Sequence, residues 1–225
     1  MRAAAELAGQ GCPSGTVVGA DEQTAGRGRH GHSWHSEAAA GLYITEILRL
    51  PVKPDELPIV TLMLGLAAAE AIFQTCGIQC DLRWPNDVLI GSRKCAGILV
   101  QLQDSAMLAG IGINVNQREF PEELRPIATS LRQASGREHS RQDLLDGLLT
   151  SIDQWSETLL TEGKEAILRL FAQSSSYVRG RQVVVDQDGS RLEGITDGLS
   201  SAGFLIVREN NGRRTTILTG GVRPA

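Results

Sequence analysis

The stretch Gly26-Arg27-Gly28-Arg29-His30-Gly31-His32-Ser33-Trp34 decides between two interpretations of the fold. Its first part matches the GxGxxG fingerprint of dinucleotide-binding domains, and Glu46 follows at about the twenty-residue spacing of the acid that binds ribose. That fingerprint has to open an apolar helix. The residues from His32 onward are polar and aromatic and show no helical periodicity. The sequence therefore argues against a dinucleotide-binding fold.

A glycine-rich loop with two arginines suits the binding of an anion. Its glycines leave backbone N–H groups accessible, and Arg27 and Arg29 add guanidinium groups that bind phosphate or carboxylate through paired hydrogen bonds. Trp34 is placed to cover a ligand when the loop closes. The same stretch also holds the histidines His30, His32 and His35. No cysteine or carboxylate follows them at ligand spacing, so we expect no metal site. A plain surface loop is the alternative.

The first three quarters of the chain predict alternating helices and strands. Residues 1–10 predict a short helix, 16–20 a buried strand, 41–50 a second strand and 58–76 a long apolar helix that starts at a proline. Further strands are predicted at 79–84, 88–90, 97–103 and 107–115. Ser140 and Asp143 resemble a capping box, and the apolar residues that follow recur at helical spacing to Leu159. A last helix is predicted at 164–171.

The polar segment 173–176 is the predicted domain boundary. Beyond it, short strands are predicted at 182–185, 191–196, 203–208 and 215–218. We therefore expect an α+β fold, with a central mixed β-sheet and flanking helices in residues 1–175 and a small SH3-like β-barrel in residues 176–225.

Composition excludes several classes of protein. The formal net charge of -4 argues against a general nucleic-acid binder. The longest apolar stretch, 58–73, is short for a bilayer and contains Glu70, and residues 1–10 do not resemble a signal peptide. The cysteines, which lack a zinc or redox spacing, are Cys12, Cys76, Cys80 and Cys95. We expect a cytoplasmic protein with reduced cysteines that binds neither nucleic acid nor membrane.

A second polar cluster follows the long helix. In Arg83-Trp84-Pro85-Asn86-Asp87 a tight turn is expected to hold Asn86 and Asp87 at one end of a sheet, and the next hairpin to bring Lys94 to the same end. An Asn-Asp turn alone is usually structural. Further on, Asn114 closes the last predicted strand of the sheet with a polar amide. The sequence shows no Ser–His–Asp or Cys–His arrangement, so covalent catalysis is not indicated.

Four blocks together resemble the biotin–protein ligase family in their order and spacing. They are GRGRHGHSW at 26–34, WPND at 84–87, RKCAGILV at 93–100 and GIGIN at 110–114. The segments 194–198 and 219–222, with Gly203, resemble the small β-domain of that family. The resemblance covers nearly the whole chain. Lipoate ligases share the fold in outline, but the paired GRGR and WPND blocks favour biotin.

The resemblance implies a two-step reaction without a protein nucleophile. The carboxylate of biotin attacks the α-phosphate of ATP and gives biotinyl-5'-AMP and pyrophosphate, with Mg2+ accompanying ATP. A lysine of a biotin carboxyl carrier protein, from acetyl-CoA carboxylase or a related biotin-dependent enzyme, then attacks the mixed anhydride and AMP leaves. Such chemistry needs positioning and charge neutralisation. The resemblance also implies a weak homodimer.

The resemblance assigns roles residue by residue. The implied catalytic residues are Lys94, Arg29 and Asp87, of which Lys94 and Arg29 touch both the biotin carboxyl group and the α-phosphate. The implied biotin-binding residues are Gln23, Gly26, Arg27, Gly28, Arg29, Lys94, Gly97, Ile98 and Gly110. The implied ATP-binding residues are Arg29, His32, Trp34, Asn86, Lys94, Ile113 and Asn114. From its charge and placement, Asp87 is expected to orient or deprotonate the incoming lysine.

The sequence departs from the family pattern at its start. The family opens this domain with a strand that ends in a Ser-Thr-Asn turn against biotin, whereas residues 1–7 here match the following helix. We therefore expect a pocket without that strand and weaker binding of biotin. A helix–turn–helix is also missing, so a repressor role is not expected. Two alternatives remain open: a lipoate-type acyl-adenylate ligase, and a non-catalytic protein that binds biotin or a nucleotide.

Overall fold

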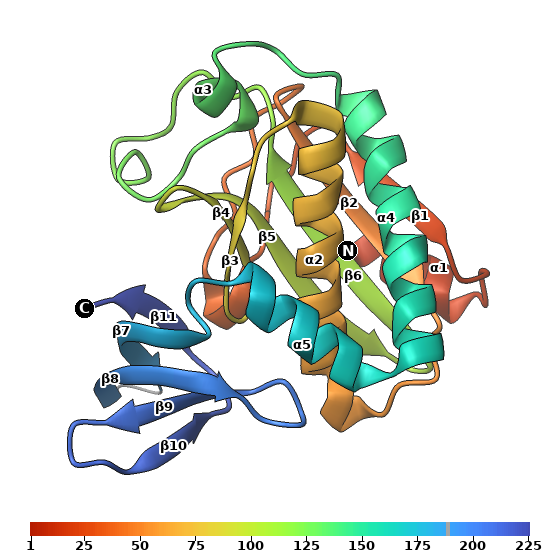
Figure 1. Ribbon diagram of the computed structural model, residues 1–225. Helices are drawn as coiled ribbons and strands as arrows, with labels where there is room; N and C mark the ends of the chain where they lie inside the picture. Colours follow the sequence, from red (N-terminus) through yellow and green to blue (C-terminus); the bar gives the residue numbers. More distant parts are fainter. Residues whose placement is uncertain (188–189) are drawn as a thin grey trace.

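The computed structural model describes residues 1–187 and 190–225, apart from the side chains of His30, Gln187 and Ser190, and contains two β-sheets (Figure 1). The larger sheet has six strands in the order β1-β2-β6-β5-β4-β3. Their bounds are β1 Thr16–Ala20, β2 Gly41–Leu48, β3 Asp81–Arg83, β4 Asp87–Ile90, β5 Arg93–Gln103 and β6 Ala106–Asn114. All of these strand pairs are antiparallel, so the prediction of a mixed sheet was wrong.

Helices cover both faces of this sheet unequally (Figure 1). Their bounds are α1 Arg2–Gly9, α2 Leu57–Cys76, α3 Leu131–Ser135, α4 Arg141–Glu162 and α5 Lys164–Ser174, with short 3-10 helices at Arg29–Gly31 and Pro54–Glu56. The long helices α2 and α4 pack on one face, and the short α1 lies against the other. Ser140 caps α4 as predicted, because its Oγ accepts the N–H of Asp143 at 3.1 Å. Much of the second face is therefore left to loops.

Helix α2 is the core helix of the protein. Together with the preceding turn it forms a continuous helical segment Pro54–Cys76, which is long and apolar enough to cross a membrane by length and composition. The segment is thus longer than the apolar stretch 58–73 that was read from the sequence. Most of the segment is buried by the sheet, α4 and α5, and a helix surrounded on all sides needs apolar residues all round.

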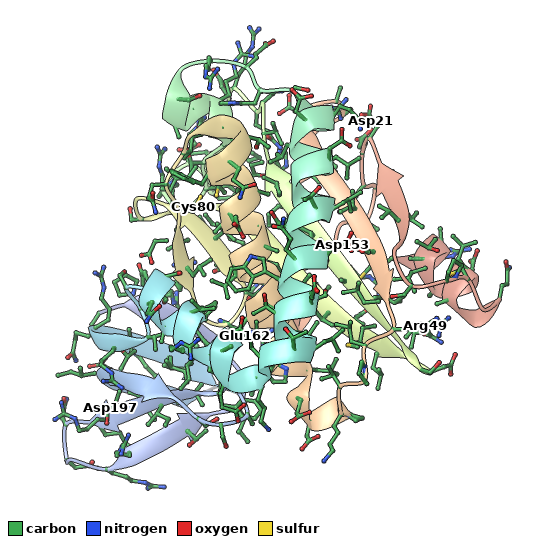
Figure 2. All side chains as sticks on the ribbon, turned by 45° about the vertical axis from the view of Figure 1, so that its right-hand side comes forward. Asp21, Arg49, Cys80, Asp153, Glu162 and Asp197 are labelled. Atoms are coloured by element: carbon green, nitrogen blue, oxygen red, sulfur yellow. The ribbon has the colours of Figure 1, made fainter. Side chains whose placement is uncertain are left out.

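Helix α1 is fastened to the second face of the sheet by a small apolar cluster and by one arginine. Ala4 and Ala8 pack against Ile47 of β2. The side chain of Arg49, labelled in Figure 2, donates to the carbonyl of Ala8 at 3.1 Å and to the carbonyl of Cys12 at 3.2 Å. These bonds fix the end of α1 next to the edge of the sheet. Strand β1 itself is an edge strand and is not buried, contrary to prediction.

The smaller sheet holds five antiparallel strands in the order β10-β9-β8-β7-β11. Their bounds are β7 Arg179–Gln187, β8 Ser190–Leu199, β9 Leu205–Glu209, β10 Arg214–Ile217 and β11 Gly221–Pro224. Strand β11 was not predicted, since its glycines and proline disguise it. The described strands form an open sheet with β10 and β11 at its edges, so a closed SH3-like barrel is not confirmed. The indole N–H of Trp84 donates to the carbonyl of Gly203 at 2.9 Å and joins the two sheets in a continuous core.

Candidate functional site

A strip of glycines forms an open floor on the face of the large sheet that α2 and α4 leave free. Gly97 of β5 lies opposite Gly112 of β6, and Gly110 lies two residues before Gly112 on the same face. The alternating neighbours Ile98 and Ile113 point to the other face and are buried in the helical core. A ligand can therefore approach the backbone of two strands directly at this strip.

Two side chains rest on this glycine strip. A Cβ atom on Gly112 would lie 2.7 Å from Cε2 of Trp34, and one on Gly97 would lie 2.9 Å from Cζ3 of the same ring. A Cβ atom on Gly110 would lie 2.8 Å from Cε of Met1. The indole nitrogen of Trp34 is buried and has no hydrogen-bond partner. The glycine strip thus allows flat groups such as the indole of Trp34 to lie on it. A side chain in place of any of these glycines would displace them.

The loop that carries Trp34 folds back on itself as a small hairpin. The N–H of Gly28 donates to the carbonyl of His32 at 2.7 Å, and the N–H of Trp34 donates to the carbonyl of Gly26 at 2.9 Å. A Cβ atom on Gly26 would lie 2.8 Å from the amide oxygen of Gln23, so this glycine is needed for close packing. The predicted loop residues Gln23, Gly26 and Gly28 therefore lie together beside Trp34.

A β-bulge turns Lys94 toward the glycine strip. The register between β4 and β5 shifts so that Val88 pairs with Ala96 while Leu89 pairs with Lys94, which leaves Cys95 as the extra residue. Without this bulge, residues 94 and 97 would lie on opposite faces of the strand. A Cβ atom on Gly97 would instead lie 2.9 Å from Nζ of Lys94. The ammonium group also lies 5.3 Å from the centre of the Trp34 ring.

Lys94 is held by a carboxylate that has a second cation as partner. Oδ1 of Asp87 forms an ion pair with Nζ of Lys94, and Oδ2 accepts from Nε and Nη2 of Arg83 at 3.1 and 2.7 Å. Burial alone would raise the pKa of Asp87, but the nearby charges of Lys94 and Arg83 outweigh it and hold that pKa below its ordinary value. Asp87 is therefore ionised at neutral pH and is a weak base.

The two arginines of the loop differ in their position. Burial lowers the pKa of Arg29, and the charge of Asp87 opposes this effect, so the two side chains lie within electrostatic range of each other. An arginine remains charged at neutral pH despite such a shift. Arg27 is exposed on the outside of the loop. The structure thus pairs Lys94 with Asp87 and puts Arg29 within electrostatic range of that pair, whereas Arg27 is exposed.

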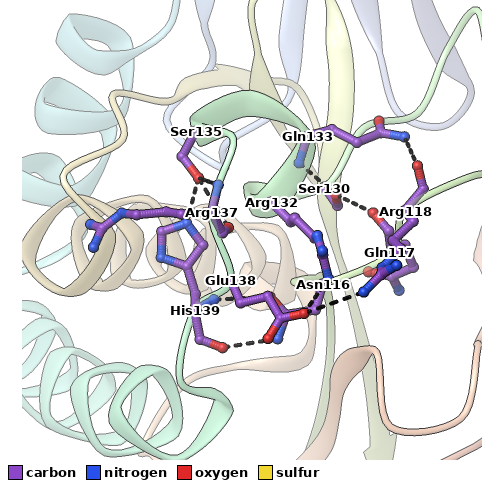
Figure 3. Close-up of polar contacts among 10 residues, drawn as sticks. All are labelled: Asn116, Gln117, Arg118, Ser130, Arg132, Gln133, Ser135, Arg137, Glu138 and His139. Carbon is purple, nitrogen blue, oxygen red and sulfur yellow. Dashed lines mark hydrogen bonds and ion pairs between the residues drawn. The ribbon is translucent and has the colours of Figure 1, made fainter.

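The main chain of Lys94 is fixed by a segment that the sequence analysis did not connect with it. The N–H of Lys94 donates to the carbonyl of Ile127 at 2.8 Å, and the N–H of Thr129 donates to the carbonyl of Lys94 at 2.9 Å. Figure 3 shows the polar network between residues 116–118 and 130–139, which flank this segment in the sequence. In it, the hydroxyl of Ser130 donates to the carbonyl of Gln117 at 2.7 Å and caps α3.

The two predicted asparagines have structural partners. The amide of Asn86 donates to the carbonyl of Ile98 at 2.9 Å and ties the turn before β4 to β5. The amide of Asn114 donates to the carbonyl of Thr129 at 3.1 Å, and its side chain is buried. Both residues therefore support the site from within. The side chains of Ile98 and Ile113, also predicted to contact ligands, lie in the core and reach the site only through their backbone.

A cavity of about 610 Å³ opens next to this cluster, between the large sheet and the C-terminal strands. It is lined by His32, Arg83, Trp84, Pro85, Asn86, Asp87, Asp186, Thr219, Gly220, Gly221, Val222 and Arg223. Among the described side chains, which exclude His30, no group of three carboxylate, histidine or cysteine ligands is placed to hold a metal ion. The sequence had placed Arg83 in the second polar cluster, directly before the WPND block, but had indicated no role for it or for the residues of β11.

Comparison with known proteins places this fold and site in one family. Residues 3–117 match the Biotin/lipoate A/B protein ligase family. The bifunctional ligase/repressor BirA of Bacillus subtilis is 36% identical over 219 residues, which are 94% of this chain and 67% of that protein. The biotin--[acetyl-CoA-carboxylase] ligase of Mycobacterium tuberculosis is 31% identical over 218 residues, which are 92% of this chain and 77% of that protein.

A solved structure agrees with these sequence matches. The biotin protein ligase of Aquifex aeolicus, in complex with biotin and ATP, superposes with a TM-score of 0.84 at 32% identity, over 95% of this chain and 91% of that one. The family match spans the glycine strip, the bulge of β5 and the loop of Trp34. The chain therefore belongs to the biotin/lipoate A/B protein ligase family.

Proposed function

We propose that this protein is an ATP-dependent biotin–protein ligase, which forms biotinyl-5'-AMP and transfers biotin to a lysine of a biotin carboxyl carrier protein, with formation of a C–N bond. The observation that carries the proposal is the meeting of Lys94, Arg29 and Asp87 beside a glycine strip roofed by Trp34. Relatives that are named ligases for acetyl-CoA carboxylase support this choice of acceptor.

The first step joins two anions, and the site supplies the opposing charge. A carboxylate oxygen of biotin forms a bond to the α-phosphorus of ATP while the bond to the pyrophosphate oxygen breaks. Lys94 and Arg29 would neutralise the charge that accumulates between the two groups. Because Asp87 holds the ammonium of Lys94 from one side, that ammonium has a fixed place beside Gly97 before any ligand arrives.

Biotin would lie on the glycine strip. The bicyclic ring system of biotin is compact, and Gly97, Gly110 and Gly112 present a surface without side chains on which it fits. Trp34 covers part of this surface, so biotin would lift the indole, which would then close over the ligand. Gln23, Gly26, Arg27 and Gly28 belong to the same moving loop.

ATP would enter from the cavity beside the WPND turn. His32 and Asn86 line that cavity together with backbone groups of the C-terminal strands. Asn86, Asn114 and Ile113 would act by shaping the site, since their own partners are internal. Magnesium would be carried by the phosphates of ATP, because the described residues do not offer a set of protein ligands.

In the second step the neutral amine of the acceptor lysine attacks the acyl carbon of the mixed anhydride, AMP leaves with the bonding electrons, and the proton that the nitrogen loses passes to solvent. Asp87 would orient the incoming amine and Lys94 through its fixed carboxylate. A deprotonating role fits less well, because the lowered pKa of Asp87 makes it a weak base.

The same proposal covers the organisation of the chain. Residues 1–175 would form the catalytic part that binds biotin and ATP, and residues 176–225 a C-terminal unit of SH3-like strand course, supported by five consecutive antiparallel strands. A cytoplasmic location and a weak homodimer through the edge of the six-stranded sheet complete the proposal. Sedimentation velocity at several protein concentrations would detect that dimer.

The experiment that tests this function is ATP-dependent transfer of biotin to a biotin carboxyl carrier domain, followed by intact mass. We expect the carrier to gain one biotin, and Lys94→Ala to lower adenylate formation by about a hundredfold or more. Lys164→Ala, which removes a lysine paired with Glu56 away from the site, is the matched control.

The same experiment separates the alternatives. Exchange of pyrophosphate into ATP that depends on lipoate and not on biotin would identify a lipoate-type ligase. Stabilisation by biotin without exchange or transfer would identify a non-catalytic binding protein. A loss smaller than about threefold in Lys94→Ala would overturn the role of Lys94.

A further inference from the structure

We propose that Arg83 is a positioning residue of the ligase reaction, which couples the linker to the C-terminal unit, at Tyr177, to the Asp87–Lys94 pair of the active site. This inference rests on the proposed function. Arg83 stands outside the residues to which the family resemblance gave a role, and its two ends contact two different parts of the chain.

One end of Arg83 decides which oxygen of Asp87 faces Lys94. The guanidinium donates through both Nε and Nη2 to Oδ2 of Asp87, at 3.1 and 2.7 Å. Oδ1 is then the oxygen that remains for Nζ of Lys94. The side chains of Arg83 and Asp87 are 18% and 15% exposed, so the pair is shielded enough for its geometry to persist.

The other side of Arg83 rests on an aromatic ring. Cζ of Arg83 lies 5.9 Å from the centre of the Tyr177 ring, and Cζ of Arg181 lies 4.9 Å from the same centre. Tyr177 is buried and belongs to the segment that leads from α5 into β7. A guanidinium within about 6 Å of an aromatic ring is attracted to it and loses freedom of movement.

Tyr177 keeps its place without help from Arg83, because the residues before it are bonded to β3. The hydroxyl of Ser175 donates to the carbonyl of Leu82 at 2.5 Å. The N–H and hydroxyl of Ser176 donate to the two carboxylate oxygens of Asp81 at 2.8 and 2.6 Å. The ring is therefore a fixed platform beside Arg83 and not a side chain that follows it.

An arginine is suited to this position and a lysine is not. The planar guanidinium bonds the carboxylate along its edge while its side faces the ring, whereas an ammonium is a point charge that cannot hold both contacts in one orientation. The contacts therefore run from Tyr177 through Arg83 and Asp87 to Lys94. If Arg83 is removed, both oxygens of Asp87 become free to take Lys94 and to draw its ammonium away from the reacting groups.

The experiment measures biotin-dependent exchange of pyrophosphate into ATP, with kcat and the KM for biotin determined separately. We expect Arg83→Gln to lower kcat by about tenfold or more and to leave KM within about threefold, since Lys94 is misplaced while the glycine strip is intact. Arg83→Lys should recover only part of kcat. Tyr177→Leu should lower kcat by about threefold or more, and Tyr177→Phe, which keeps the ring, should not.

A pH profile separates positioning from a general loss of structure. The charged or titratable groups that face Asp87 or share its cavity are Arg83, Lys94, Arg29, His32, Asp186 and Arg223. Removing the charge of Arg83 raises the pKa of Asp87, so the acid limb of kcat should lie at higher pH in Arg83→Gln than in wild type. Arg83→Lys keeps the charge and should not show that displacement.

Arg181→Gln is the matched control, because Arg181 is exposed, faces the same ring and bonds through its N–H to the hydroxyl of Thr196 on β8. It should retain kcat within twofold of wild type. The inference is overturned if Arg83→Gln is folded and keeps kcat within twofold, or if Arg181→Gln loses as much as Arg83→Gln. Failure of the proposed function is a separate result, since wild type itself would then show no exchange.

Discussion

The two faces of the six-stranded sheet are made from alternate residues of the same strands, yet they serve opposite purposes. On the helix face, Ile98, Ile111 and Ile113 are buried in the core. On the site face, the residues next to them are Gly97 and Gly112, which leave the backbone bare. One face therefore packs side chains closely and excludes water. The other face has no side chains at these positions, so a ligand can occupy that space.

Each face also carries one buried carboxylate, and the two have opposite electrostatic surroundings. Asp87 on the site face contacts two cations, and its pKa is lowered. Glu46 alternates with Ile47 on β2 and lies on the helix face, where burial, with a smaller contribution from Asp153 of α4, raises its pKa to about 7. One oxygen of Glu46 is buried without a hydrogen-bond partner. A buried charge is retained where the site uses it, and a proton replaces it where the site does not.

The largest expected effects are those of substitutions on the two faces of β6, one of which should change stability and the other the binding of biotin. Ile113→Ala should lower the free energy of unfolding by about 3 kcal/mol, because it leaves a cavity in the core, and should leave the KM for biotin and ATP within about twofold. Gly112→Ala should cost less than about 1 kcal/mol and raise the KM for biotin by about tenfold or more, since its methyl group meets Trp34.

Urea unfolding and steady-state kinetics of both variants measure these effects. A loss of stability in Gly112→Ala as large as that in Ile113→Ala would show that the strip is part of the packed core. A raised KM for ATP in Ile113→Ala would restore the ligand contact that the sequence resemblance implied for that residue.

The contrast between the faces was only partly predictable from the sequence. Strand alternation predicts that Ile98 and Ile113 point away from Gly97 and Gly112, yet the family resemblance assigned ligand contacts to both, and the structure buries them. The bulge at Cys95 has no local signal, because strict alternation would place Lys94 and Gly97 on opposite faces. A bulge depends on how two strands pair, which the order of residues in one strand does not encode.

Contacts between residues far apart in the sequence are a second feature that the sequence did not predict. Arg83 is next to a recognised block, but its aromatic partner Tyr177 lies more than ninety positions later in the sequence. The resemblance nevertheless grouped Lys94, Arg29 and Asp87, whose motifs carry the order and spacing of the family, and Lys94 and Asp87 form an ion pair in the structure. Contacts between recognised motifs were therefore predictable, and contacts between a motif and the linker were not.

The second effect concerns the charged carboxylate of the site face. Asp87→Asn leaves Lys94 and Arg83 without their shared counter-ion, and we expect the free energy of unfolding at pH 7 to fall by about 2 to 3 kcal/mol. Adenylate formation should slow by about tenfold or more. Because the folded pKa of Asp87 is lowered, its stabilisation is present above the ordinary value of 3.8 and is lost as pH falls through the lowered one.

Urea titrations at pH 7 and at about pH 3, with pyrophosphate exchange at pH 7, check this prediction. The difference in stability between wild type and Asp87→Asn should shrink at the lower pH. If both half-reactions keep their wild-type rates in Asp87→Asn, the carboxylate has no part in catalysis.

Replacing the carboxylate of the helix face by its amide should raise the free energy of unfolding, whereas Asp87→Asn should lower it. Since the folded pKa of Glu46 is raised from 4.5 to about 7, its ionisation destabilises the fold, and stability is lost as pH rises between those values. Glu46→Gln removes this loss, so we expect a gain of about 2 kcal/mol at pH 8 and little change at pH 4. Thermal or urea unfolding at both values measures it, and a loss at pH 8 would mean that Glu46 is ionised in a contact that favours the fold.

The smallest effect tests whether Asp153 contributes to the raised pKa of Glu46. Asp153 is exposed on α4, labelled in Figure 2, so solvent screens its charge, and Asp153→Asn should stabilise the protein at pH 8 by only about 0.5 kcal/mol. The gain should vanish when Glu46 is already glutamine, because the repulsion then has no second charge. A gain that persists in the double variant would come from α4 alone, and burial would account for the whole of the raised pKa. In that case desolvation alone would disfavour the charge of Glu46 on the helix face, whereas cations on the site face stabilise the charge of Asp87.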